Sequence, residues 1–188
     1  MAYVLFISEN KLKDSTAING NVDVEFLLPY LKFAQKVWCE PALGTDLYEK
    51  LQADITASTL TGAYQTLVDD YIGDMLPHFA FYECLPFLRF KVSNGNIYAK
   101  TSETGTALST EEANSLREQV RNTAEYFLQR MIDYIKANLS SFPEYSSNSG
   151  GSDISPNSDA YYSGINLEIG QEQKRGITID DFLTPDLS

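Results

Sequence analysis

Basic residues, histidine and cysteine are all scarce in this chain of 188 residues. It has one His and two Cys, and 14 Lys and Arg stand against 26 Asp and Glu, for a formal net charge of −12. The two cysteines have neither zinc-ligand spacing nor a CxxC pairing, so they indicate buried reduced thiols. The shortage of Lys and Arg disfavours non-specific binding to nucleic-acid phosphates. An acidic surface would, however, suit a surface past which DNA moves without binding.

Motifs for phosphate, metal or membrane binding are also missing from the sequence. It contains no GxxxxGK[ST] and no GxGxxG motif, and no DxDxDG loop of the EF-hand type. The apolar run at the start of the chain, Ala2–Ile7, is too short for a signal-peptide core or a membrane span. We therefore expect no cofactor, no metal and no membrane contact, and a cytosol-like compartment.

His78 is the only candidate for a catalytic histidine. Histidine-based nucleophilic catalysis needs a Ser or Cys beside the imidazole and a third group that orients it. His78 instead lies between Pro77 and Phe79 in a strongly apolar stretch, and nothing in the sequence around Cys39 or Cys84 suggests thiol activation. An enzyme that uses His78 and a cysteine stays open as an alternative, but we predict no catalytic residues.

The longest periodic segment is Ser109–Leu139. Its apolar residues recur at steps of three and four and predict one helix face: Leu116, Val120, Ala124, Phe127, Met131, Tyr134 and Ile135. Ser109 and Glu112 have the spacing of a capping box. A helix of this length measures about 45 Å, so we expect it to be the spine on which shorter helices pack.

Several shorter helices are predicted before this spine. Asp23 has the character of an N-cap, Pro29 should kink the following helix or set its true start, and Pro41 with Gly44 should end it. A second helix should begin after Thr45 or Asp46. Helical spacing returns over residues 62–73, and Pro77 should introduce a helix over 75–90 that is apolar all round and hence buried.

The remaining segments predict strands or flexible chain. Asn94-Gly95 between two β-rich runs is typical of a tight β-hairpin near 87–100. After residue 139 the chain becomes rich in Ser, Asn and Gly, and residues 140–188 hold eight acidic and two basic residues, half of the net charge. Short apolar islands on such an acidic string are typical of docking segments, with a disordered terminus as the alternative.

We therefore predict a mainly α fold: a helical bundle around one long helix, with a β-hairpin protrusion and an extended C-terminal arm. The expected organisation is an N-terminal extended segment (1–22), a helical domain (23–139) with the hairpin near 87–100, and a flexible acidic arm (140–188). The residues predicted to contact other chains are Asn94, Gly95, Tyr161, Tyr162, Ile165, Leu167, Ile169, Ile177, Ile179, Phe182 and Leu183.

The segment Asp23–Leu51 resembles the opening of head–tail connector (adaptor) proteins of tailed bacteriophages, most closely the type in crAss-like and other Bacteroides phages. The resemblance lies in Asp23-x-x-Phe26-Leu27-x-Pro29-Tyr30-Leu31-x-x-Ala34-Gln35 followed by Pro41-Ala42-Leu43-Gly44-Thr45-Asp46-Leu47-Tyr48-x-x-Leu51. The run Ile7–Lys13 also looks like the lead-in of that family. The motif covers about the first third of the chain, and the long acidic C-terminus has no counterpart in the family pattern.

This resemblance implies a non-enzymatic virion protein, assembled in the host cytoplasm. It implies a head–tail connector ring, usually of twelve copies, that docks on the portal protein, extends the DNA channel and gives the tail or a second ring protein an attachment surface. DNA would pass through this channel without specific binding. The alternative is a cytoplasmic helical regulatory module whose acidic tail blocks a basic partner.

Overall fold

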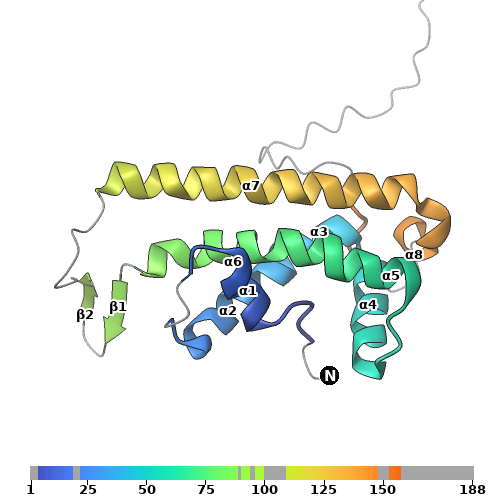
Figure 1. The fold of residues 1–188 in the computed structure, drawn as a ribbon, viewed down its shortest axis with the longest axis horizontal. Coiled ribbons are helices and arrows are strands. Elements are labelled where there is room, and N and C mark those ends of the chain that lie inside the picture. Colours follow the sequence, from blue (N-terminus) through green and yellow to red (C-terminus); the bar gives the residue numbers. More distant parts are fainter. Residues whose placement is uncertain are drawn as a thin grey trace, which may run out of the picture.

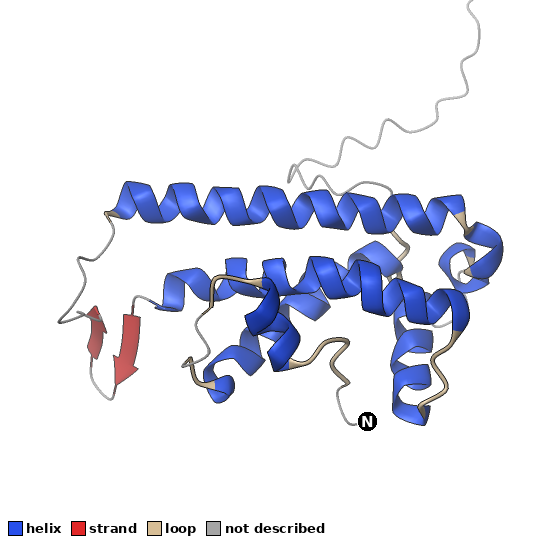
Figure 2. Ribbon diagram, in the orientation of Figure 1, coloured by secondary structure: helices blue, strands red, loops and turns tan. Residues whose placement is uncertain are grey.

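The structure, a computed structural model, describes residues 4–18, 22–88, 109–147 and 153–157, together with two strands between residues 90 and 99. This described part is mainly α-helical (Figure 2). Its elements in chain order are α1 Glu9–Ser15, α2 Val24–Ala34, the π-helix η1 Gln35–Cys39, α3 Glu40–Leu43, α4 Thr45–Ala57, α5 Gly62–Thr66, the π-helix η2 Leu67–Ile72, α6 Gly73–Leu88, β1 Phe90–Ser93, β2 Asn96–Ala99, α7 Thr110–Ala137, the 3₁₀-helix η3 Leu139–Ser141 and α8 Pro143–Ser146.

The long helix α7 lies along α6 and runs antiparallel to it, while α1, α2 and α4 lie on the other side of α6 and α3 also contacts α7 (Figure 1). The predicted capping box is confirmed, because Glu112 N–H donates to Ser109 Oγ at 3.2 Å and Ser109 N–H donates to Glu112 Oε2 at 2.8 Å. These two bonds satisfy amides that the first turn of a helix leaves without partners. The sequence thus located the start of α7 to the residue.

The buried face of α7 is rotated slightly from the predicted one. Its buried residues are Ala124, Leu128, Met131, Ile132 and Ile135. Leu128 and Ile132 were not among the predicted core residues, and Leu116, which was, is 37% exposed. Leu116 stays accessible because it lines an open groove between α7, α1 and α6.

Two helical runs continue through prolines that were predicted to interrupt them. Residues 24–43 are helical throughout, with Pro29 inside α2, Pro41 inside α3 and the π-helix η1 between them. Residues 62–88 form a second continuous run, so the prediction that Pro77 introduces a separate helix is wrong. Gly44 does end the first run, at a φ of +75° that favours glycine.

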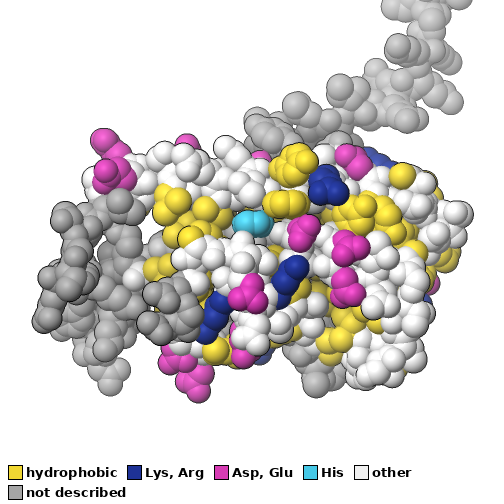
Figure 3. Space-filling view, in the orientation of Figure 1, with side chains coloured by type: hydrophobic (Ala, Val, Ile, Leu, Met, Phe, Trp, Pro, Cys, Tyr) yellow, Lys and Arg dark blue, Asp and Glu magenta, His cyan; other side chains and the backbone are white. Residues whose placement is uncertain are grey.

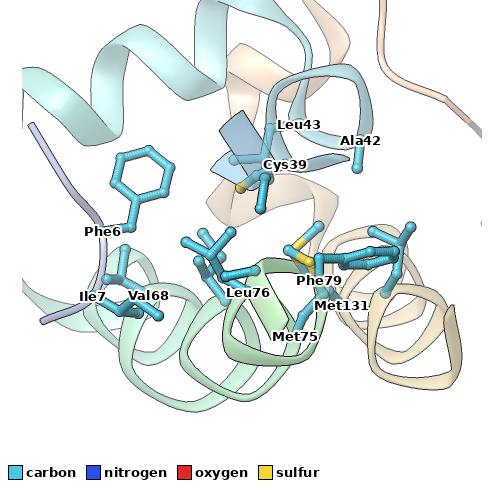
Figure 4. Close-up of a cluster of buried hydrophobic side chains, with 14 of the residues drawn as sticks. Phe6, Ile7, Cys39, Ala42, Leu43, Val68, Met75, Leu76, Phe79 and Met131 are labelled. Carbon is cyan, nitrogen blue, oxygen red and sulfur yellow. The ribbon is translucent and has the colours of Figure 1, made fainter. Parts of the chain in front are cut away.

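The hydrophobic core lies where α2, η1, α4, α6 and α7 meet (Figure 4). Leu43, Leu76, Phe79 and Met131 are each fully buried in it. Cys39 lies in the same cluster, beside apolar side chains from three other elements. Burial of this apolar surface is the main stabilising contribution to the fold.

The prediction of an N-terminal extended segment over 1–22 is wrong for its described part. Ser8 caps the seven-residue helix α1, accepting a hydrogen bond from Lys11 N–H at 3.3 Å, and Leu12 of this helix is buried. The buried Gln35 amide holds the preceding chain, because it accepts from Phe6 N–H at 2.9 Å and donates to Val4 O at 2.8 Å. A single buried leucine gives too little periodicity to reveal α1 in the sequence.

The body also extends beyond residue 139, where the flexible arm was predicted to begin. Phe142 is fully buried, and its ring packs edge-on against Tyr64 and Tyr134. Tyr64 OH donates to Glu144 Oε2 at 2.6 Å, which holds α8 against α5. The described part of the body therefore ends at residue 157.

The strands β1 and β2 pair antiparallel, from Phe90 opposite Ala99 to Ser93 opposite Asn96. The intervening Asn94 and Gly95 lie outside the described residues. Whether this pair contacts a neighbouring subunit stays a prediction.

Candidate functional site

All the residues predicted to contact other chains lie outside the described residues, at positions 94 and 95 or after residue 157. Their roles stay predictions. The described part of the chain, however, offers surface features of its own that bear on partner binding.

The first feature is an apolar stripe along α2 and η1, which we call the α2 stripe. It consists of Phe26, Tyr30, Phe33 and Val37, with Phe87 from the end of α6 packed beside them. The spacing of four, three and four residues places the first four on one helix face. The neighbouring positions Leu27, Leu31 and Ala34 are buried and attach the helix to the core.

The α2 stripe is held in place by ring contacts and yet remains accessible. Tyr30 lies between Phe26 and Phe87, with ring centroids 5.3 Å from each. Phe33, Val37 and Phe87 are 50%, 41% and 49% exposed. Clustered exposed aromatic residues mark interaction surfaces more often than isolated apolar residues do.

Helical periodicity alone does not distinguish this stripe from the buried face of the helix. It groups Phe26, Tyr30 and Val37 with the inward-facing residues of one helix. Two neighbouring apolar stripes, one at 26, 30, 33 and 37 and one at 27, 31, 34 and 38, are wider than one buried face requires. Such a helix is expected to face the core with one stripe and a partner with the other.

The second feature is a clasp, in which residues 153–157 bind at the junction of α3 and α4. Thr45 N–H donates to Ile154 O at 3.0 Å, and Ile154 N–H donates to Thr45 Oγ1 at 3.1 Å. Asn157 N–H donates to Pro41 O at 2.8 Å. The Pro41–Thr45 turn, part of the motif that carries the family resemblance, is therefore the surface that holds the C-terminal end of the body.

Close packing and a charged hydrogen bond complete the clasp. A Cβ at Gly44 would lie 2.7 Å from Pro156 Cγ, so only glycine lets this proline approach. Thr45 Oγ1 donates to Asp153 Oδ1 at 2.6 Å, and this hydrogen bond to the carboxylate lowers the pKa of Asp153. The contact spans more than one hundred residues of sequence, so no local pattern could have predicted it.

The third feature is a groove of about 410 Å³ between α7, α6 and the end of α1. His78 lies half-buried in it, with its ring stacked on Phe127 at 5.3 Å, and hydrophobic side chains lie around the imidazole on this face (Figure 3). Burial lowers the pKa of His78, and Asp74 opposes this with a smaller effect. Asp14 and Ser15, from the end of α1, line the same groove as His78.

The two thiols lie in surroundings that disfavour the reactive thiolate. Burial raises the pKa of Cys39, with a smaller contribution from Glu40, and burial raises the pKa of Cys84 to about 12. Cys84 donates to Phe81 O at 3.3 Å. Reactive cysteines have a lowered pKa and an open, electropositive setting, so both thiols fit the predicted packing role.

Neither a metal site nor a membrane helix is found in the part of the chain that the structure describes. Within those ranges no three His, Cys, Asp or Glu side chains gather closely enough to hold a metal ion. Among the described helices none combines the length and apolar character that crossing a membrane would require.

Comparison with known proteins gave one family match. Residues 39–154 match the model of DUF6712, which is described as a family of unknown function. Searches of the curated proteins and of the solved structures gave no match. The matched range begins at the end of η1 and reaches Ile154, so it includes the Pro41–Thr45 half of the clasp and the first two residues of the other half, Asp153 and Ile154.

Proposed function

From its membership of the DUF6712 family, whose function is unknown, and from its own residues, we propose that this chain is a non-enzymatic structural protein of a phage virion. It forms a head–tail connector ring that docks on the portal protein, extends the DNA channel and presents the attachment surface for the tail or for a second ring protein. Twelve copies is the number that the family resemblance implies. The protein would assemble in the host cytoplasm and act in the virion.

The observation that carries this proposal is the double use of the segment Asp23–Leu51. This segment carries the resemblance to connector proteins, and it also builds both the α2 stripe and the floor of the clasp. A stripe with Phe33 half exposed needs a partner surface. A ring supplies that surface through repeated contacts between different faces of identical subunits.

The charge of the chain is compatible with the same role. A net charge of −12 makes the surface repel DNA phosphates rather than bind them. A channel that DNA crosses in both packaging and ejection needs this property. We propose that the β1–β2 pair and the residues after 157 supply further contacts to neighbouring subunits, the portal or the tail.

The test is assembly with the portal protein. We expect negative-stain images and mass photometry of the purified chain mixed with portal to show closed rings of one size bound to the portal. A Phe33→Asp variant should bind the portal poorly and form few rings, whereas Tyr126→Asp, which changes the exposed aromatic residue on α7, should assemble normally. A chain that stays monomeric with and without portal would refute the proposal.

The second candidate is a cytoplasmic helical module that blocks a basic partner with its acidic C-terminus. The eight acidic residues after residue 139, against two basic ones, favour this candidate. Titration of DNA-binding proteins with the chain separates the two functions. Release of DNA at equimolar chain, with no ring formed on portal, would support the module and exclude the connector.

A further inference from the structure

We propose that the α2 stripe is the binding surface for this chain's own C-terminal segment, Ile177–Leu183. This proposal rests on the proposed function only in treating the C-terminal segment as a segment that binds a protein surface. It adds the surface to which the segment binds.

The clasp determines where the rest of the chain starts. Asn157, the last described residue, is hydrogen-bonded to Pro41, about one helical turn from Val37 at the end of the α2 stripe. The 31 residues that follow therefore leave the body beside the stripe. Residues 158–176 span at most about 65 Å when extended, enough to reach the stripe of the same copy or of an adjoining one.

The dimensions of the two partners agree. From Phe26 to Val37 the stripe is about 16 Å long at the rise of a helix. The segment Ile177–Leu183 is about 23 Å long when extended. An extended peptide of this length can therefore cover the whole stripe and place its apolar side chains against exposed rings.

The charges are complementary as well. Lys32 and Lys36 are exposed beside Phe33 and Val37, and Lys36, although paired with Glu40, keeps a side chain that is 60% exposed. Asp180 and Asp181 lie between the apolar residues Ile179 and Phe182 in the sequence. Asp23 and Glu25, at the opposite end of α2, would repel these acids, so the acidic pair is expected at the Lys32–Lys36 end.

The experiment is disulfide trapping in the full-length chain. One variant carries Val37→Cys and Thr184→Cys, and a second carries Phe33→Cys and Thr184→Cys. The matched control carries Tyr126→Cys and Thr184→Cys. All three body positions are exposed, and Tyr126 is the most exposed at 62%. The native thiols are buried and do not compete.

Under mild oxidation of dilute protein, non-reducing gels should show the stripe disulfides forming about ten-fold faster than the control, because docking raises the effective concentration. A dimer reports docking on a second copy, and a looped monomer reports docking within one copy and places the stripe outside any contact between copies. Either product at this rate supports the docking surface itself. Excess peptide with the sequence of residues 176–184 should slow the reaction, and a scrambled peptide should not.

Equal rates for the stripe and control variants would overturn the proposal, and so would indifference to the competing peptide. This result is separate from the test of the connector function. Rings on the portal together with equal trapping rates would refute the docking surface alone. Fast trapping by a chain that ignores the portal would refute the connector role alone.

Discussion

Replacement of Gly44 by alanine tests the clasp most directly. Gly44 has φ +75° and ψ 159°, a region of backbone space that residues with a Cβ rarely adopt. A Cβ there would also meet Pro156 Cγ and Cδ at 2.7 and 2.8 Å. The substitution therefore strains the backbone between α3 and α4 and pushes residues 153–157 away from their binding surface.

The expected loss of stability follows from these two effects. Backbone strain at such a position is worth about 1–3 kcal/mol. Displacement of Pro156 weakens the neighbouring hydrogen bonds of Ile154 and Asn157, each of which contributes about 1 kcal/mol. We expect Gly44→Ala to lower the free energy of unfolding by about 2–5 kcal/mol.

Gly62→Ala is the matched control, because Gly62 has φ +61° but no neighbouring atom lies within 4 Å of the place that an alanine Cβ would take. It should lose only about 1–2 kcal/mol, from backbone strain alone. Urea denaturation followed by circular dichroism gives the free energies, provided that the slope of the transition is unchanged. Pro156→Ala combined with Gly44→Ala completes a double-mutant cycle.

The cycle isolates the contact between the two residues. Removal of Cγ and Cδ from residue 156 should make the double variant more stable than the sum of the single effects by about 1–2 kcal/mol. If Gly44→Ala and Gly62→Ala cost the same, and the double variant is simply additive, then the packing of Pro156 on Gly44 contributes nothing and the clasp is not a stabilising contact.

Three further predictions concern the clasp, the core and the groove. Thr45→Val removes the hydrogen bond that lowers the pKa of Asp153, so the variant should be less stable than wild type at pH 7. The difference in free energy of unfolding should become smaller as the pH falls below about 4, because the carboxylate is then protonated. An equal difference in urea denaturation at pH 7 and at pH 3 would contradict this. Leu128→Ala should lower the free energy of unfolding by about 2–5 kcal/mol because the side chain is buried, whereas Leu116→Ala, at a residue that is 37% exposed, should lower it by only about 1 kcal/mol. The same denaturation assay decides, and equal losses would contradict the rotated face of α7. His78 has a lowered pKa in the folded protein, so as the pH falls below about 6.5 the unfolded chain takes up a proton first and wild type loses stability. His78→Gln should not show this loss. If the free energy of unfolding depends on pH in the same way in both proteins, burial of His78 is not linked to folding.

The sequence predicted best the features that depend on residues close together. The caps at Asp23 and Ser109 each rest on contacts two or three residues along the chain, and both are present. The mainly α class and the extent of the long helix follow from periodic spacing in the same way. The end of the first helical run at Gly44 could be anticipated because glycine adopts positive φ without strain.

Features that depend on distant residues were missed. The buried end of the body, with Phe142 and the clasp, is stabilised by partners some 80 to 116 residues away, and its composition alone is that of a flexible linker. The packed N-terminus depends on Gln35, 29 residues from Phe6. The exposure of Phe33 could not be predicted for another reason. The helices that pack on α2 decide which of its two adjacent apolar stripes is buried, and the sequence of α2 alone does not specify this.

The two longest helical stretches, residues 62–88 and α7, determine where the body can bend. Residues 62–88 form one rod and α7, with its 28 residues, forms another beside it, and the core lies between them and the shorter helices. Kinks in long helices occur at prolines and at π-helical turns, and the run over residues 62–88 contains η2, Pro77 and Pro86, whereas α7 has no proline. If this pair of helices bends, the bend is therefore expected in the run over residues 62–88 and not in α7.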